Sequence, residues 1–399
     1  MNGFNRLFTA GYRVFFLAAG LYAVFAMLVW EGWLGVHAAG GMVSDMPFAM
    51  APHLWHAHEL IFGYTTAAIA GFLMTAAPSW VGGEGARSRF FAIAAGVWLI
   101  GRLAVWFSGS IPAGLVMVAD LAFVPVIAAR VGGLLIKRPK PRQMVFLVVL
   151  AVLFAANLMV HLEWAGITGD TAYQGLRGGL LTLGALIVIL GGRVTPAFTR
   201  NAMLRTGRED GLPSDAMPLA VAAIVAALAL PVLMLAGVEG VAFAIPALIA
   251  GGAVLARLAL WRGLWTLGQP ILWSLHLGYA MAGAGMILWG LAALGVGSEV
   301  AALHVLGIGA VGGMTLAVMS RAALGHSGRA LVASWPLALG YGALPLAAAL
   351  RFAASEWPAF YYPGVLGAGA LWILAFTLYV AELWPVFTGP KLMAEREAG

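Results

Sequence analysis

Long apolar stretches constrain this chain more than any other feature of its sequence. About twelve of them occur, each near the 20 residues that a helix needs to cross the hydrocarbon core of a bilayer. Of the 399 residues, 62% are hydrophobic and only 10% are charged, so too few polar side chains are present to cover a soluble globule. The runs lack the alternation of barrel strands, and a helix satisfies its own backbone hydrogen bonds in lipid. The sequence therefore predicts an all-α, polytopic transmembrane bundle, organised as a single membrane domain over residues 1–399.

The expected spans follow from these runs and from the Gly, Pro and charged residues between them. They are Val14–Leu34, His56–Trp80, Phe90–Phe107, Pro112–Leu135, Met144–Trp164, Tyr173–Val194, Met217–Gly237, Val241–Trp261, Pro270–Leu294, Val300–Ser320, Leu331–Phe352 and Phe360–Pro385. The longest connection on the side rich in Lys and Arg is expected between Arg193 and Met217.

The distribution of Lys and Arg gives an independent test of this count, because these residues collect in cytoplasmic loops. They follow every second expected span: Arg87 and Arg89; Lys137, Arg138, Lys140 and Arg142; Arg200, Arg205 and Arg208; Arg262; Arg321 and Arg329; Lys391. The intervening loops carry acidic residues instead. This alternation predicts that both termini lie in the cytoplasm, and the net charge of +6 reflects these loops and gives no indication of a nucleic-acid partner.

Three histidines and one carboxylate are expected at the same depth, near the outer ends of their spans. His56, His58 and Glu59 open the second span, and His304 lies a few residues into the tenth. At 1.5 Å per residue they fall within roughly 10 Å of one boundary, and His161 of the fifth span lies near it too. Ionisable groups inside a membrane are costly and usually functional. Since the chain has no cysteine, His, Met, Glu and Asp are the possible metal ligands, and we expect a metal site at His56, His58 and His304.

The spacing of the histidines limits how they act. Residues two apart on a regular helix point about 200° apart, so His56 and His58 cannot both bind one ion from such a helix. Either the backbone at His56 is irregular, or the two imidazoles have different partners. Glu59 is a candidate ligand, or the acceptor that orients an imidazole. Arg102 and Asp120, at comparable depth, are expected to form a structural ion pair.

The remaining candidates have a functional and a simpler interpretation. His161 and His276 either bind a cofactor or hydrogen-bond a neighbouring helix. Arg193 either extends to the membrane surface or binds an anionic group such as a haem propionate. His326 lies in a basic loop, where a solvated side chain is the simpler interpretation. His37 and His53 are expected unliganded in an outer loop.

Several motifs resemble the NnrS family along essentially the whole chain. They are His56-Ala57-His58-Glu59 with Phe62-Gly63, the stretch from Gly191 to Asn201, Leu275-His276-Leu277-Gly278-Tyr279, and the run from His304 to Arg329 that ends in Gly325-His326-Ser327-Gly328-Arg329. The resemblance implies a protein of the bacterial inner membrane that contains haem b and copper and takes part in denitrification and the nitric oxide response. It carries over His56, His58, His276, His304 and His326 as functional histidines, with Glu59 and Arg193 beside them.

The leading hypothesis is thus a multi-pass haem and copper protein that binds or turns over nitric oxide within membrane lipid. His56, His58 and His304 are its expected metal ligands, with His304 also near the cofactor, and His276 or His161 is the expected axial ligand of haem. If the protein is a nitric oxide-metabolising oxidoreductase, Glu59 is the carboxylate placed to pass protons. The alternatives are a secondary transporter or haem or metal exporter that uses the same histidines, and a nitric oxide sensor or carrier without catalysis.

Overall fold

The computed structural model describes residues 3–392, and this part of the chain is helical, with twelve helices long and apolar enough to cross a membrane. The predicted number of spans and the all-α class are confirmed, and the chain is a multi-pass helical membrane protein. In chain order the elements are α1 (Gly3–Leu7), α2 (Gly11–Ala38), α3 (Pro52–His58), η1 (Glu59–Tyr64), α4 (Thr65–Trp80), α5 (Ser88–Trp106), α6 (Ala113–Leu121), α7 (Phe123–Lys137), α8 (Pro141–Trp164), α9 (Ala172–Arg205), α10 (Met217–Leu235), α11 (Val241–Ala259), η2 (Gly263–Thr266), α12 (Pro270–Ala293), α13 (Glu299–His304), η3 (Val305–Gly312), α14 (Gly313–His326), α15 (Trp335–Glu356), η4 (Pro358–Phe360) and α16 (Tyr361–Thr388).

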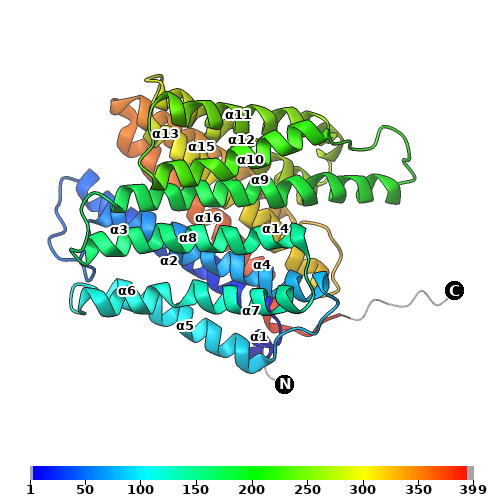
Figure 1. Cartoon of the computed structure of the whole chain (residues 1–399), viewed down its shortest axis with the longest axis horizontal. Helices are drawn as coiled ribbons and strands as arrows, with labels where there is room; N and C mark the ends of the chain where they lie inside the picture. Colours follow the sequence, from blue (N-terminus) through cyan, green and yellow to red (C-terminus); the bar gives the residue numbers. More distant parts are fainter. Residues whose placement is uncertain (1–2, 393–399) are drawn as a thin grey trace.

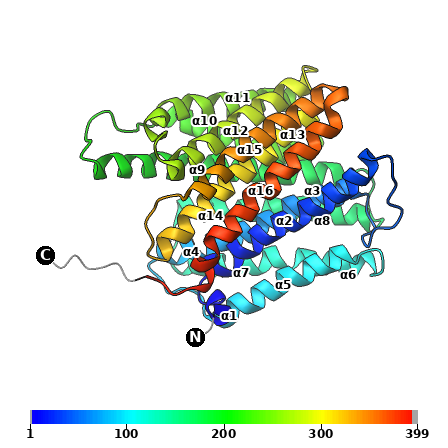
Figure 2. The same cartoon turned by 180° about the vertical axis from the view of Figure 1, so that it is seen from behind.

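The spans run side by side as a bundle of tilted rods (Figure 1). Helices α5, α6 and α7 form one side of the bundle and α10, α11 and α12 the opposite side, with α2, α4, α8, α9, α14 and α16 between them. Seen from behind, α16 runs beside α2 and α15, and it packs against both (Figure 2). One cluster of buried apolar side chains extends through the bundle, from Tyr12 on α2 to Phe387 on α16.

The two ends of the described chain meet at one end of the bundle. Arg13, near the start of α2, is 5% exposed and donates hydrogen bonds to the carbonyl oxygens of Phe387 and Gly389, at 2.7 Å each. These carbonyls belong to the last turn of α16 and the residue after it, where the helix has no further N–H donors for its own carbonyl oxygens. These hydrogen bonds join the first and twelfth spans at this end of the bundle.

Two expectations about loops are wrong. The connection expected from Arg193 to Met217 is mostly helical, because α9 continues through Pro196 to Arg205 and leaves only residues 206–216 as a loop. With 34 residues, α9 is about 51 Å long by its rise per residue, so its end projects beyond the neighbouring helices (Figure 1). His37 and His53, expected in an outer loop, lie in α2 and α3.

Glycines let α11 and α12 approach each other so closely that a side chain would not fit. A Cβ at Gly251 would lie 2.5 Å from the carbonyl oxygen of Gly283 and 3.0 Å from the backbone nitrogen of Ile287. Backbone atoms cannot move aside as a flexible side chain can. The next residue, Gly252, has no atom within 4 Å of the same position and faces outward.

These adjacent glycines give the first prediction. We expect Gly251→Ala to lower the free energy of unfolding by about 1–3 kcal/mol, since overpacking forces the helices apart. Gly252→Ala, the matched control, should leave it unchanged or raise it by up to about 1 kcal/mol through the higher helix propensity of alanine. Thermal unfolding of the purified protein in detergent, followed by circular dichroism, measures both. Equal effects of the two variants would contradict the close approach of α11 and α12.

Candidate functional site

The second span places His56 and His58 on opposite sides of one short helix. Pro52 occupies the first turn of α3, where its missing N–H is not needed, and His56 lies in regular helix. Trp55 anchors this helix: it is 1% exposed and stacks on Phe48, with ring centroids 4.8 Å apart. The interpretation that the two imidazoles have different partners is therefore confirmed. His58 faces a buried polar network, and His56 faces a cavity.

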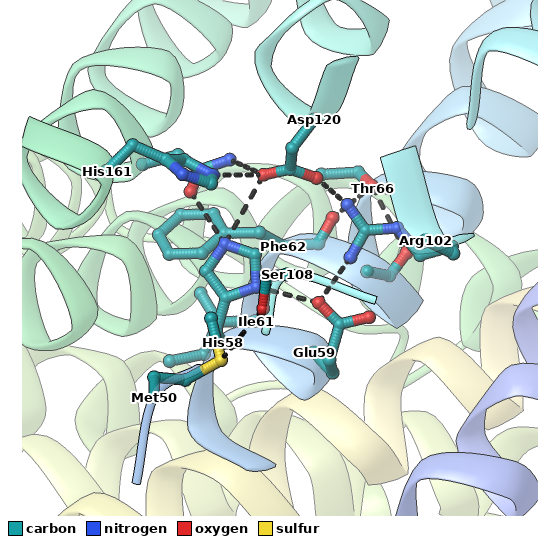
Figure 3. A network of polar contacts seen from close by, with 12 residues as sticks. Met50, His58, Glu59, Ile61, Phe62, Thr66, Arg102, Ser108, Asp120 and His161 are labelled. Atoms are coloured by element: carbon teal, nitrogen blue, oxygen red, sulfur yellow. Dashed lines mark hydrogen bonds and ion pairs between the residues drawn. The ribbon is translucent and has the colours of Figure 1, made fainter. Parts of the chain in front are cut away.

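The polar network is built around an arginine held between two carboxylates (Figure 3). Arg102 on α5 donates to Oε1 of Glu59 at 2.6 Å and forms an ion pair with Asp120 on α6. Glu59 and Asp120 are fully buried, and Arg102 is 5% exposed. The predicted structural pair of Arg102 and Asp120 is thus confirmed. Tyr22 on α2 donates its hydroxyl to the second oxygen of Glu59, so the network joins three further spans to α2.

Asp120 also collects the polar groups of the fifth span. Oδ2 of Asp120 lies 2.8 Å from Nδ2 of Asn157 and 2.8 Å from Nε2 of His161, both on α8. The same oxygen lies 3.3 Å from Nε2 of His58. Asn157 and His161 are four residues apart and share a helix face, which is why one carboxylate reaches both. His161 is thus hydrogen-bonded to a neighbouring helix, as its simpler interpretation predicts.

His58 occupies the centre of this network. Its Nδ1 lies 2.7 Å from Oε1 of Glu59, and its Nε2 lies 2.9 Å from Oδ1 of Asn157 (Figure 3). Both ring nitrogens face oxygen atoms, so whichever nitrogen carries the ring hydrogen has an acceptor. Arg102 is the cation that Glu59 and Asp120 share. Glu59 thus has one of its two expected roles: it is the acceptor that orients an imidazole, that of His58.

The same groups have the arrangement of a metal site. One ligand atom each from His58, Asp120 and His161 lies within 4.8 Å of the others. Bonds of about 2.0–2.1 Å in tetrahedral geometry place ligand atoms about 3.3 Å apart. Here Oδ2 of Asp120 lies 3.3 Å from Nε2 of His58 and 2.8 Å from Nε2 of His161. Glu59 behind Nδ1 of His58 is the outer carboxylate that commonly orients a metal-binding imidazole. A metal ion at Nε2 would take the place of the proton there.

The backbone widens into a π-helix, η1, directly after His58, and the Arg102 side chain packs against this segment at Gly63. Carbonyl oxygens of η1 accept hydrogen bonds from side chains. The carbonyl oxygen of Gly63, for example, accepts one from Nε1 of Trp98 at 2.9 Å. A Cβ at Gly63 would lie 2.8 Å from Nη1 of Arg102 and 2.7 Å from the Tyr22 ring. Glycine is therefore required at this position of the Phe62-Gly63 motif.

The cavity on the other side of α3 brings together two of the predicted histidines. It has a volume of about 290 Å³, and both His56 and His304 line it. Apart from them, His53 and a few polar side chains such as Tyr64 and Arg351, its wall is apolar. His56 stacks on Trp30 with centroids 4.7 Å apart, and its buried Nδ1 has no hydrogen-bond partner among the described residues.

His304 presents a nitrogen suited to binding a metal. Its Nδ1 lies 2.7 Å from the carbonyl oxygen of Val300, four residues earlier on α13. A carbonyl only accepts hydrogen bonds, so Nδ1 carries the hydrogen and Nε2 of the neutral ring keeps its lone pair. The tenth span also widens into a π-helix, η3, at the residue after His304. The two spans that supply the histidines therefore share the same local departure from regular helix, which is frequent at functional sites.

The other predicted cofactor residues lie elsewhere. His276 is buried in α12, where its Nε2 lies 2.9 Å from the Thr199 hydroxyl and its Nδ1 has no partner among the described residues. Arg193 is exposed and donates to the carbonyl oxygen of Arg142 at 3.2 Å. His326 is exposed at the end of α14 and lines a second cavity. None of these three lines the cavity of His56 and His304.

Sequence reasoning missed the part that Asp120 and Arg351 play. Asp120 was expected only as the partner of Arg102, whereas it is shared by Asn157 and His161 as well. Arg351, 8% exposed and lining the cavity, carried no motif of its own.

Comparison with known families adds one finding. A family model described as NnrS protein matches residues 6–391, nearly the whole chain. None of the curated proteins matches the chain.

The buried network gives the second prediction. We expect Arg102→Gln to destabilise the protein by about 3–5 kcal/mol, because it leaves Glu59 and Asp120 buried without their cation. Arg177→Gln is the matched control, since Arg177 and Glu299 form a half-exposed ion pair worth at most about 1 kcal/mol. Thermal unfolding in detergent compares the two. An Arg102→Gln variant as stable as the control would show that the carboxylates do not need the guanidinium.

Proposed function

The chain belongs to the NnrS family, and from this premise we propose that it is a bacterial inner-membrane protein that holds haem b and copper and binds or turns over nitric oxide. The observation that carries the proposal is the cavity shared by His56 and His304, which come from spans far apart in the sequence. His56 and His304 on one largely apolar cavity are a donor set that suits haem iron, while the third histidine on the wall, His53, contacts the Tyr173 hydroxyl. Small-molecule sites of this kind are typically lined by apolar groups with few polar ones.

The cavity offers haem more than two imidazole nitrogens: a cation and an open part of the wall also fit the group. Nε2 of His304 is free to bind iron, and His56 has an unpartnered buried nitrogen. Arg351 supplies a buried cation on the cavity wall, where an acidic group of the macrocycle could be neutralised. Gly307 in η3 leaves part of the wall without a side chain. We assign the haem to His56 and His304 on these grounds.

We assign copper to His58, Asp120 and His161. The predicted set of His56, His58 and His304 lies in two places, and His58 has a carboxylate and a second imidazole as its neighbours. Imidazole binds copper well, and the absence of cysteine leaves such nitrogen and oxygen ligands as the natural choice. Glu59 fixes His58 with its Nε2 toward Asp120, so the outer partner of the ligand is built into the fold.

Bound haem and copper would supply redox-active ions to which nitric oxide binds. The chain's own residues do the rest. The apolar wall excludes water, and nitric oxide, being small and weakly polar, reaches it through the bilayer. Glu59 is the proposed proton carrier, because it links His58 to the Tyr22 hydroxyl. His276, His326 and Arg193 lie outside both sites and remain candidates for a further cofactor contact.

The orientation of the bundle follows from its charges. The chain ends meet at one end of the bundle, and we place that end in the cytoplasm because the basic loops alternate with acidic ones. His56, His58 and His304 then lie near the periplasmic face. Lipid surrounds the spans, and the described residues act as a single domain in this proposal.

Transport is the second candidate function, and one observation favours it. A narrower cavity lined by Ala68, Ile187 and Thr315 lies between the cavity of His56 and the second cavity near His326, so hollow space follows one seam along the bundle. Tyr64 lines the cavity of His56 and Thr315 lines the narrower cavity, and the hydrogen bond between these two side chains lies where the two cavities adjoin. A transporter would need this pair to part.

Visible spectra test the haem assignment. We expect the protein, purified after expression with ample haem, to show a Soret band that is lost or shifted in His304→Ala and in His56→Ala. His37→Ala is the control, because His37 lies outside the cavity, with its Nδ1 bound to the carbonyl oxygen of Trp33. A wild-type protein without a Soret band would refute the haem assignment and leave transport as the better candidate.

Copper analysis tests the second site. We expect His161→Ala to lose bound copper while it keeps the Soret band, since the two sites share no ligand. Glu59→Gln should weaken copper binding about 10–100-fold, the usual cost of removing an outer partner of a ligand. Metal content by mass spectrometry, measured beside the spectrum of each variant, distinguishes the sites. Loss of both metals in every variant would contradict their separation.

Consumption of nitric oxide tests turnover. Under anaerobic conditions with an artificial reductant, we expect Glu59→Gln reloaded with copper to consume nitric oxide about 10²–10⁴-fold more slowly, as for loss of an acid–base group. Stoichiometric binding without consumption by the wild-type protein would instead favour a sensor or carrier.

A further inference from the structure

The second cavity lies at the opposite end of the bundle from His56 and His304. It has a volume of about 330 Å³ and lies among α2, α4, α9 and α14, close to the ends of the last three. Phe16, Phe72, Val194 and Phe198 form much of its wall, and Arg321 and His326 are its ionisable side chains. The hydroxyl of Thr75, also on the wall, donates to the carbonyl oxygen of Gly71 on its own helix.

Arg321 is a buried cation without an anionic partner. It is 7% exposed, and its Nη1 has no hydrogen-bond partner in residues 3–392. No carboxylate of the described chain forms an ion pair with it, and a second cation, Arg205 at the end of α9, adds to the positive charge around it. Its guanidinium lies over the Phe198 ring, 4.1 Å from the centroid. The ring face attracts the cation but offers no acceptor for Nη1.

An unpaired guanidinium at this depth is costly. Arg351 at the other cavity has one acceptor, the Ser355 hydroxyl, and three further buried arginines are neutralised or bound by several acceptors. Arg102 has two carboxylates, Arg257 has Asp215 at 2.7 Å, and Arg13 has three carbonyl oxygens. Arg321 differs from these three in facing a cavity instead of an acceptor. A group that enters the cavity with a negative charge would supply what the fold leaves out.

We propose that this cavity binds an amphipathic anion, with its carboxylate or phosphate against Arg321 and its hydrocarbon body along the apolar wall. The imidazole of His326, which stacks on Tyr12, supplies a second donor at the charged end. A fatty-acid carboxylate and a phospholipid phosphate share this chemistry. An uncharged carbonyl compound would accept a hydrogen bond from Nη1 but would leave the positive charges of Arg321 and Arg205 unopposed. The site is independent of the haem and copper assignments, because it shares no residue with them.

Native mass spectrometry of the purified full-length protein in a non-ionic detergent tests the proposal. The probes are palmitate, hexadecanol and dipalmitoyl phosphatidate, added in separate titrations. We expect one palmitate or one phosphatidate to bind at least about tenfold more tightly than hexadecanol, because a charge-assisted hydrogen bond is absent from the alcohol. The preferred acid identifies the source as a free fatty acid or a phospholipid.

Variants locate the bound probe. Arg321→Gln should reduce the affinity for both acids about tenfold or more, to that of hexadecanol, whereas Arg321→Lys keeps the charge and should retain most of it. Ala76→Phe, which fills the cavity from α4 and leaves Arg321 in place, should weaken all three probes. Arg208→Gln, on an exposed arginine outside the cavity, is the control.

Two results would overturn the proposal. One is equal binding of palmitate, phosphatidate and hexadecanol by the wild-type protein, which would mean that charge is not recognised. The other is unchanged acid binding in Arg321→Gln or in Ala76→Phe, which would place the acid elsewhere. Thermal unfolding of each variant guards against loss of fold, and if Arg321→Gln does not fold, Arg321→Lys and Ala76→Phe still decide.

Discussion

The cost of placing a charge in hydrocarbon organises one half of this protein. Arg102 cannot be buried in the bundle without anions, and Glu59 and Asp120 cannot be buried without a cation. The three groups come from η1, α5 and α6, so neutralising the charges fixes three spans relative to one another. Helix packing in lipid lacks the hydrophobic drive of packing in water, and polar contacts between spans carry more of the specificity there. His58 enters the same network and inherits its fixed position.

The π-helices extend this constraint to the second and tenth spans. A π-turn adds one residue to a helical turn, which rotates every later side chain relative to those before it. Glu59, the first residue of η1, accepts a hydrogen bond from Arg102. Tyr64, the last residue of η1, contacts Thr315 on the tenth span. In η3 it follows His304, whose Nδ1 is fixed by Val300. Both histidines thus end a regular helical turn, so their rings are held by ordinary i to i+4 geometry while the backbone beyond them is adjusted.

The sequence was sufficient for the number of spans, because twenty apolar residues and alternating basic loops are direct consequences of the bilayer. It also predicted the pairing of Arg102 with Asp120 from depth alone. For His56 and His58, helical angles left two possibilities, an irregular backbone at His56 or different partners for the two imidazoles. It could not show that Asp120 is shared with Asn157 and His161, since depth fixes the level of a residue but not which helices are neighbours. The continuation of α9 through Pro196 was missed because proline usually ends a helix. The π-helical segments have only six and eight residues, too few to leave a signal of their own in the hydrophobic periodicity of the spans.

The arrangement around α3 makes the two proposed metal sites mechanically dependent on each other. His56 and His58 point to opposite sides of the same helical turn, and Trp55, stacked on Phe48, fixes the rotation of that turn. Any rotation that carried His56 further into its cavity would move His58 away from Asp120 and break the buried polar network. Because that network is buried and costly to disrupt, it holds His56 in place for whatever the cavity binds. The polar network therefore contributes to the cavity even without touching it, and a short helix with two histidines two residues apart is the simplest way to build that dependence.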